Sequence, residues 1–203
     1  MKVSAICIGR PEKVPGKTYK TGLNKVPVSG AVMVDETGLL GDSVLNRKHH
    51  GGRDQAVYGL GTIDLSAWED ELGMPLPPGT FGENLVIEGA DSRSVRVGDR
   101  FETADVLLEV TATRTPCATL AARMGDPYFA RRFNAVARPG FYCRVLRQGL
   151  LQTGEAVTFQ PFAGPSVTMP ELLQLRPGRL REEERGRYLS LPIGERLRAL
   201  IGG

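Results

Sequence analysis

The sequence predicts a mainly β fold, a closed or nearly closed β-barrel with peripheral helices, followed by a small helical extension at the C-terminus. Three observations lead to this prediction. Short apolar or alternating segments recur up to about residue 160, the 25 glycines and 14 prolines are spread between them, and the pattern becomes helical and charged after Met169. Many short strands with glycine turns are typical of barrels, in which closure removes exposed edges.

The expected strands are short apolar or β-branched runs bounded by turn residues. In chain order they are residues 3–8, 28–34, 55–60, 84–87, 95–97, 100–102, 105–113, 141–146 and 156–159. The strongest is 105–113, in which successive side chains face alternate sides. Glycine and proline punctuation predicts long loops at 9–27 and 74–82 and a turn within 148–154.

Helices are expected beside these strands. Thr62 or Asp64 can cap a helix that ends near Leu72, and Gly73 is suited to the left-handed residue that terminates it. Two further short helices are expected at 118–124 and 127–136, the second with a proline in its first turn.

A change of composition near Pro161 divides the chain into an expected barrel domain of residues 1–162 and an extension of residues 163–203. The helices expected in the extension are 170–175, 179–189 and 193–201. The Arg and Glu residues at 179–187 are explained by i,i+3 and i,i+4 pairs on a solvated helix face.

Composition argues against several classes of protein. The 26 Lys+Arg and 23 Asp+Glu residues leave a net charge of +3, without the basic stripe of a nucleic-acid-binding surface. Cys7, Cys117 and Cys143 contain no CxxC pair, which argues against a disulfide framework and a structural zinc site and fits a reducing compartment. There is no signal-peptide pattern and no apolar stretch that could span a bilayer. We therefore expect a soluble, cytoplasmic protein with no membrane or nucleic-acid polymer as partner.

The tetrapeptide Arg114-Thr115-Pro116-Cys117 is the most informative feature for chemistry. Pro116 ends the preceding β run, because proline fixes φ and lacks a backbone donor. The turn can direct the Cys117 side chain out of the sheet, and a nearby guanidinium favours the thiolate, which ligates metals or attacks as a nucleophile. The structural alternative is that Cys117 is a small buried hydrophobic residue.

Two other segments are candidate binding loops. The glycines of His49-His50-Gly51-Gly52 allow backbone N–H groups to approach an anion, and the loop Phe81-Gly82-Glu83-Asn84 ends in an amide that could hydrogen-bond a planar heterocycle. The structural alternatives are a tight Gly-Gly turn and an Asx turn. The phosphate-loop, HExxH and GxSxG motifs are absent from the sequence.

Several short motifs occur in a characteristic order. They are Gly41-Asp42, His50-Gly51-Gly52, Ala56-Val57-Tyr58, Phe81-Gly82-Glu83-Asn84, Gly98-Asp99, Leu108-Glu109-Val110-Thr111, Arg114-Thr115-Pro116-Cys117 and Gly140-Phe141-Tyr142-Cys143-Arg144-Val145-Leu146. In this order they resemble the MOSC domain family, the C-terminal domain of molybdenum cofactor sulfurases, and within it the YiiM-like stand-alone bacterial branch. The resemblance covers roughly residues 3–160, and that branch also carries a short helical C-terminal extension.

The resemblance implies a MOSC barrel related to the pyruvate kinase barrel domain, and a molybdopterin-type molybdenum cofactor whose metal is ligated by the catalytic Cys117. The cofactor-binding residues that it implies are Lys25, His50, Gly51, Gly52, Phe81, Gly82, Glu83, Asn84 and Arg114. Arg114 and Lys25 would balance the negative charge of the cofactor. The two glycines and the 81–84 loop would hold the pterin, and His50 and Asn84 would hydrogen-bond the pterin or the substrate.

The resemblance further implies an oxidoreductase that reduces small N-hydroxylated compounds such as hydroxylaminopurine. Its electrons would come from a separate reductase, because the chain shows no flavin or iron–sulfur motif. The alternatives are a non-redox protein that carries the cofactor or a persulfide sulfur, and a purely structural barrel. The sequence leaves the oligomeric state open, a homodimer included.

Overall fold

The computed structural model describes residues 1–14, 18–45 and 51–203 as a mixed α/β structure. Its main element is an eight-stranded sheet, in which β7 and β8 form the parallel pair and the other ladders are antiparallel. In sheet order its strands are β13 (Thr158–Gln160), β9 (Arg100–Glu102), β10 (Leu107–Thr113), β11 (Phe141–Arg147), β7 (Val57–Gly61), β8 (Leu85–Ile87), β1 (Val3–Gly9) and β4 (Lys25–Pro27). Two small sheets join β12 (Gly149–Leu151), β5 (Val32–Asp35) and β6 (Gly38–Leu39), and β2 (Glu12–Lys13) with β3 (Lys20–Thr21).

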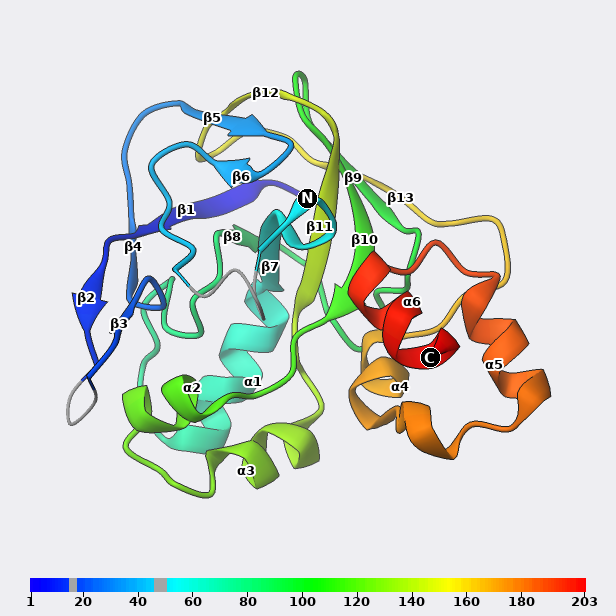
Figure 1. Cartoon of the computed structure of the whole chain (residues 1–203). Coiled ribbons are helices and arrows are strands. Elements are labelled where there is room, and N and C mark those ends of the chain that lie inside the picture. The colour runs from blue at the N-terminus through cyan, green and yellow to red at the C-terminus, as the bar shows by residue number, and fades with distance from the viewer. Residues whose placement is uncertain (15–17, 46–50) are drawn as a thin grey trace.

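The helices lie below and beside the strands in Figure 1. They are α1 (Thr62–Leu72), α2 (Ala118–Arg123), α3 (Phe129–Val136), α4 (Met169–Gln174), α5 (Glu182–Leu189) and α6 (Glu195–Gly202), with 3₁₀ turns η1 (Arg53–Gln55) and η2 (Pro177–Arg179). Within the described part of the chain, no helix has the length and apolar character needed to cross a membrane.

We expected a closed or nearly closed barrel, and the described residues form no closed barrel. The strands β13 and β4 stand at opposite edges of the sheet and do not pair with each other. The first residues of the chain instead meet residues 154–157, with hydrogen bonds of 2.9 Å from Val3 N to Glu155 O and from Val157 N to Met1 O. Pro27 in β4 and Pro161 just after β13 lack the backbone N–H that a further strand would need at these positions.

Several strand boundaries also differ from expectation. The loop expected at 9–27 contains β2, β3 and β4, which are two or three residues long and largely polar, so they lack an apolar alternation. The strand expected at 28–34 is interrupted by Gly30, whose φ of 84° turns the chain before β5. Residues 95–97 form only a bridge to Thr168, and β12 occupies part of the turn expected at 148–154.

The expected helix at 62–72 is confirmed. It ends at Gly73, whose φ of 66° is left-handed as expected, but its N-cap is Gly61 and not Thr62 or Asp64. The helix that was expected to start at Pro127 begins at Phe129, with Tyr128 as its N-cap.

Two hydrophobic clusters use alternate residues of the same strands and therefore lie on opposite faces of the sheet. One contains Phe101 stacked on Phe141 at 4.8 Å between ring centroids. The other surrounds Trp68 of α1, whose ring lies 5.1 Å from Phe81 and 5.5 Å from Phe133 of α3. This second cluster carries the helices that support the site.

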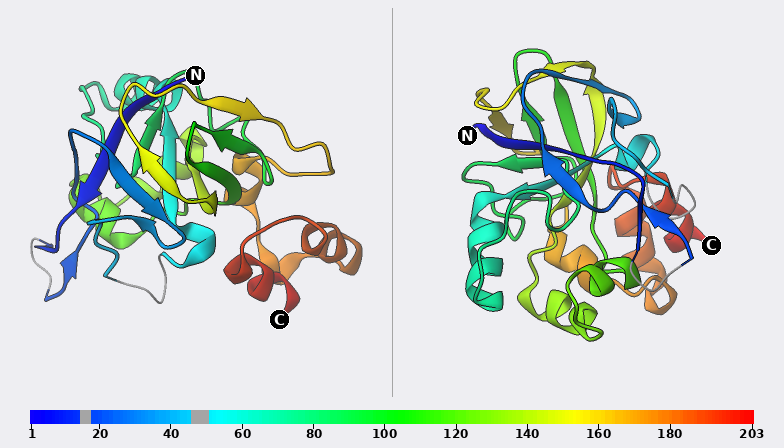
Figure 2. Two further views of the ribbon diagram at one scale, coloured as in Figure 1. Left: turned by 90° about the horizontal axis from the view of Figure 1, so that it is seen from above. Right: turned by 90° about the vertical axis from the view of Figure 1, so that its left-hand side faces the viewer.

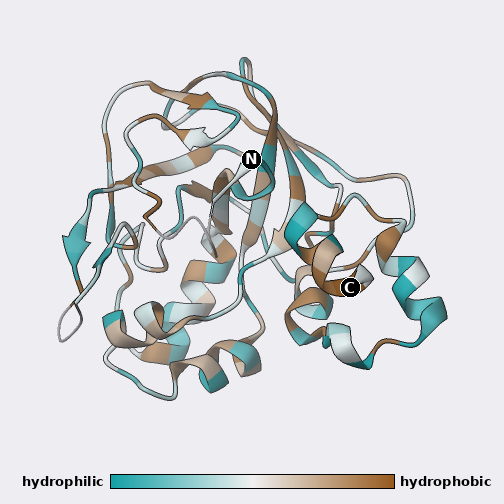
Figure 3. Ribbon diagram, in the orientation of Figure 1, coloured by the Kyte–Doolittle hydropathy of each residue, from teal (hydrophilic) through white to brown (hydrophobic). Residues whose placement is uncertain are grey.

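The C-terminal extension shares the first cluster. Its buried members are Val167, Met169, Leu172, Tyr188, Leu191, Ile193 and Ile201. Backbone bonds also join it to the strands, from Val97 N to Val167 O at 3.0 Å and from Gly194 N to Thr111 O at 3.1 Å. In Figure 2 the helices α5 and α6 stand to one side of the sheet, and in Figure 3 α5 is mostly hydrophilic. The division at residues 162 and 163 stays a prediction.

Candidate functional site

A pocket forms where segments distant in sequence meet. It holds about 790 Å³ of empty space, part of it open to solvent. Its walls come from residues 19–23 and 42–45, from β7, and from the chain between β10 and α2. Small-molecule sites usually combine apolar walls with a few converging polar groups, and the lining of this pocket contains both.

The pocket brings together most of the residues predicted from the sequence. Those that line it are Lys25, Gly51, Gly82, Asn84, Arg114 and Cys117. Gly52 is exposed outside the lining, and Phe81 and Glu83 are buried behind it. His50 lies outside the described residues.

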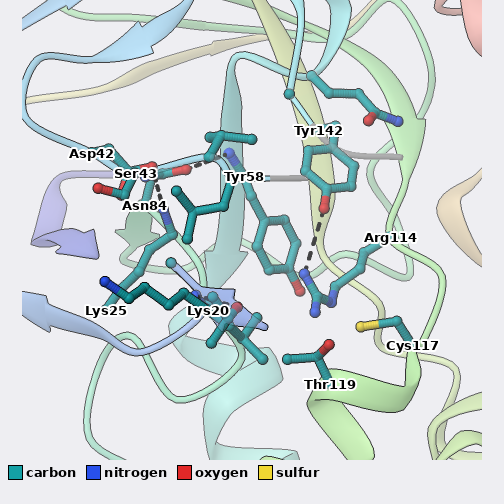
Figure 4. A pocket seen from close by; sticks show the side chains of 18 of the residues that line it. Lys20, Lys25, Asp42, Ser43, Tyr58, Asn84, Arg114, Cys117, Thr119 and Tyr142 are labelled. Atoms are coloured by element: carbon teal, nitrogen blue, oxygen red, sulfur yellow. Dashed lines mark hydrogen bonds and ion pairs between the residues drawn. The ribbon is translucent and has the colours of Figure 1, made fainter. Parts of the chain in front are cut away.

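Cys117 is the half-buried member of the three cysteines, whereas Cys7 and Cys143 are fully buried within strands. It follows Pro116 in extended conformation and forms the N-cap position of α2. In Figure 4 its sulfur points towards Arg114 and Thr119. Cys117 is therefore accessible from the pocket and is not sealed in the core.

The other two thiols are suited to packing. Burial raises the pKa of Cys7 to about 12, with a further contribution from the Glu83 charge. Burial also raises the pKa of Cys143 well above its ordinary value. Both thiols remain protonated at neutral pH, so neither is prepared for metal ligation.

The raised pKa of Cys7 predicts a loss of stability at high pH. In the unfolded chain the thiol loses its proton near pH 9, whereas in the folded protein it keeps it up to about pH 12. The stabilisation is complete below pH 9 and disappears as the pH rises towards 12, at about 1.4 kcal/mol per pH unit. Urea unfolding between pH 8 and 11 measures this slope, and we expect Cys7→Ala to make it shallower by that amount. Identical slopes in both proteins would contradict the prediction.

Arg114 is a buried cation that forms no ion pair with the described residues. Its side chain is 3 % exposed. Nη1 donates to Tyr142 Oη at 3.4 Å, and the guanidinium lies 5.0 Å from the centroid of the Tyr58 ring. Nε and Nη2 are buried and have no hydrogen-bond partner among the described residues. Because an uncompensated buried charge costs several kcal/mol, this group is prepared for an anion that binds in the pocket.

Lys25 is paired on the other side of the pocket. Its Nζ contacts Asp42 Oδ2, and both side chains are buried at 7 % and 6 % exposed. Asp42 is itself held by Gly9 N at 2.8 Å and by Asn84 Nδ2 at 2.9 Å. Burial lowers the pKa of Lys25 below its ordinary value, although the Asp42 charge opposes this shift.

The 81–84 loop is held together by its own side chains. Glu83 accepts hydrogen bonds from Gly79 N at 2.5 Å and Phe81 N at 3.0 Å. Asn84 uses both amide hydrogens within the protein, on Asp42 and on Cys7 O at 3.4 Å, and its oxygen accepts from Tyr58 N. Glu83 and Asn84 therefore shape the pocket, while the chain at Gly82 forms its surface.

Gly82 allows the loop to approach the opposite wall closely. Its φ is 80°, and a Cβ atom at this position would lie 2.4 Å from Leu23 Cδ1. A side chain at residue 82 would thus clash with Leu23 and strain the backbone.

The comparison with known families identifies the family of this chain. Residues 46–158 match the MOSC domain model, more than half of the chain. The chain belongs to the MOSC domain family. It is 32% identical to the uncharacterized protein YflK of Bacillus subtilis over 154 residues, and the match covers 75% of this chain and 70% of that protein.

A second relative and a solved structure are also similar to this MOSC protein. A protein named "Reductase" from Gibberella moniliformis is 32% identical over 148 residues, which cover 70% of this chain but only 26% of that protein. The crystal structure of YiiM from Geobacillus stearothermophilus has a TM-score of 0.79 at 22% identity and covers 99% of this chain and 97% of its own. The fold is therefore YiiM-like.

Sequence reasoning missed several residues of this MOSC pocket. Asp42, Tyr58 and Tyr142 all line it and hold Lys25, Asn84 or Arg114. Each stands in a motif that supported the resemblance, and that was the available signal.

Residues 19–23 line the pocket and contact α2 next to Cys117. Tyr19 Oη lies 3.1 Å from Thr119 Oγ1, and Arg123 Nη1 donates to Asn24 Oδ1. These contacts join residues 19–24 to α2 across a sequence separation of about 100 residues, which no local pattern predicts.

Proposed function

We propose that this MOSC protein binds a molybdenum cofactor in the pocket and reduces small N-hydroxylated compounds such as hydroxylaminopurine. The observation that carries the proposal is the convergence in one pocket of the half-buried Cys117 and the buried Arg114, whose Nε and Nη2 find no partner in the described part of the chain. The name of the Gibberella relative supports redox chemistry. The electrons would come from a separate reductase.

The residues of the pocket fit such a cofactor. Cys117 offers a soft sulfur ligand, and the described residues contain no group of three or more His, Cys, Asp or Glu side chains that could hold a metal alone. A metal at Cys117 would then need ligands from a cofactor. Arg114 would bind an anionic group of that cofactor through Nε and Nη2, with Lys20 adding positive charge to the walls, whereas the charge of Lys25 is balanced by Asp42.

The chain's own contribution is binding, orientation and exclusion of water. When bound, the cofactor supplies the two-electron chemistry that removes oxygen from an N–OH group. Leu23, Val44 and Leu45 provide apolar lining for a planar substrate. The ring of Tyr58 beneath the Arg114 guanidinium keeps that cation in place.

The proposal is tested by measuring molybdenum and pterin in the purified protein, together with reduction of hydroxylaminopurine in the presence of a competent reductase. We expect bound molybdenum and turnover. Bound molybdenum without turnover would favour the carrier function, and protein that takes up no cofactor under reconstitution would contradict the proposal.

The role proposed for Arg114 predicts an unusual pair of effects. We expect Arg114→Met to leave the cofactor-free protein at least as stable as wild type, because the substitution removes a buried charge that has no ion pair with the described residues. We also expect it to abolish the stabilisation that molybdate gives to wild type, which at 100 times the Kd is about 2.7 kcal/mol, or roughly 5–10 °C in Tm. Thermal unfolding with and without molybdate measures both effects.

Arg123→Met is the matched control, because this arginine is already bonded to Asn24 and Leu23. We expect that variant to be less stable than wild type and still stabilised by molybdate. An Arg114→Met protein that responds to molybdate like wild type would contradict the assignment.

A further inference from the structure

The buried ion pair of Lys25 and Asp42 is a feature that fold stability alone does not explain. Removing two charges from water is costly, and buried ion pairs are often no more stabilising than apolar side chains of similar size. The pair nevertheless lies at a pocket wall, with exposures of 7 % and 6 %. Its position therefore indicates a role towards a ligand.

The pair faces the proposed metal ligand across the pocket. In Figure 4, Lys25, Asp42 and Asn84 lie on one side, and Arg114 and Cys117 lie on the other. A substrate between the two sides would touch the ammonium group at one end and the Cys117 side at the other.

The ammonium group has hydrogens to spare. A lysine ammonium carries three N–H donors, and the described residues provide one acceptor, Asp42. Asp42 is fixed by Gly9 N and Asn84 Nδ2, so it restricts where Nζ can lie. The remaining donors are available to a ligand.

Four ionisable groups act on this lysine. Asp42 and Glu83 favour its charged form, whereas Arg114 and the burial of the site disfavour it. Cys7, on β1, interacts with Lys25 as well and stays protonated. The balance leaves an ammonium group that releases its proton more readily than an exposed lysine does.

We propose that Lys25 donates the proton that the substrate nitrogen takes up when the N–O bond breaks, and that Asp42 is the residue that positions Lys25 for this step. This inference rests on the proposed N-hydroxyl reduction. Two electrons from the reductase cleave the N–O bond of R–NH–OH. The nitrogen takes a proton from Lys25 Nζ to give the amine, the oxygen leaves as hydroxide and takes a proton from solvent to give water, and Lys25 is reprotonated from solvent.

The first test is chemical rescue of Lys25→Ala. We expect the variant to keep its molybdenum but to lose about 10²–10⁴-fold in kcat, the usual contribution of a positioned proton donor. Added ethylamine or propylamine would restore part of the rate. In a series of amines compared at the same concentration of the protonated form, the amine with the lower pKa would restore more of the rate. A lysine that served only packing or charge balance would show no such dependence on amine acidity.

The second test measures how Asp42 affects the pKa of Lys25. A proton donor must be protonated, so the rate falls as the pH rises through the pKa of Lys25. Asp42→Asn removes a charge that raises this pKa, so we expect the alkaline limb of the kcat profile to move to lower pH. A ¹³Cε NMR titration of labelled lysine would show the same shift without any turnover.

Glu88→Gln is the matched control, because it removes the acidic partner of the surface residue Lys2 at 3.0 Å and makes the same change of charge away from the pocket. We expect its alkaline limb and Lys25 titration to match those of wild type.

Three results would overturn the inference: an unchanged rate in Lys25→Ala, loss of molybdenum from that variant, or an unmoved alkaline limb in Asp42→Asn. Each leaves the proposed function standing if wild type turns over. Molybdenum-loaded wild type that fails to turn over with a reductase overturns the proposed function itself, and the inference with it.

Discussion

Serine in place of Cys117 is expected to remove molybdenum from the protein and to lower N-hydroxyl reduction by more than about 100-fold, since loss of outer partners of a metal ligand alone costs 10–100-fold. The hydroxyl of serine is a harder and far less acidic group than a thiol, and it is a poor substitute as a soft ligand. The fold is expected to survive, because this side chain is half-buried at the start of a short helix. Metal analysis, turnover assays and thermal unfolding of the same preparation measure the molybdenum content, the activity and the stability of the fold.

Cys143→Ala provides the opposite pattern as a control. Cys143 is fully buried in β11, so we expect this variant to lose about 1 kcal/mol of stability, as small deletions in a core do, and to keep both metal and activity. Full molybdenum occupancy in Cys117→Ser would end the assignment of Cys117 as the ligand.

Deletion of the chain after Pro165 is expected to abolish cooperative unfolding. The deletion removes the seven buried side chains of the extension named above. At roughly 1.5–3 kcal/mol each, they contribute about 10–20 kcal/mol of gross stabilisation, which is comparable with the 5–15 kcal/mol of a whole domain. Circular dichroism during heating and binding of a hydrophobic dye would show a chain without fixed tertiary packing.

Single substitutions within the extension test the same point without deletion. We expect Leu191→Ala, at a side chain 2 % exposed, to cost about 2–5 kcal/mol. Leu200→Ala, at a side chain 67 % exposed, would cost no more than about 0.5 kcal/mol. A deleted protein with the melting temperature of the full chain would instead show that residues 1–165 fold alone.

The extent to which the sequence predicts this fold differs between helices and strands. The α1 helix was predictable because apolar residues at helical spacing, such as Leu65 and Trp68, precede a glycine that can take a left-handed conformation. The strands β2 and β3 were not predictable, because two polar residues each carry no periodicity and pair only through the backbone. The first residues of the chain pair with residues 154–157, and local pattern contains no information on such distant pairs.

The residues of the site were also predictable only in part. Arg114 and Cys117 could be proposed from one tetrapeptide, and the structure places both in the pocket. Asn84 and Glu83 were also singled out, but their polar groups are occupied by neighbouring backbone and by Asp42. Residue type predicted that these side chains would make hydrogen bonds, and only the fold determines that the partners lie within the protein.

The unequal burial of the three sulfur atoms has a consequence for oxidative damage. Peroxide can reach Cys117, whereas Cys7 and Cys143 are sealed in strands and carry protonated thiols. A sulfenic acid at Cys117 would then have no second thiol of the same chain to trap it as a disulfide, and without an external thiol it would proceed to the irreversible sulfinic and sulfonic acids. The accessibility that suits this cysteine to a metal therefore makes inactivation of the metal-free protein permanent unless small thiols are present.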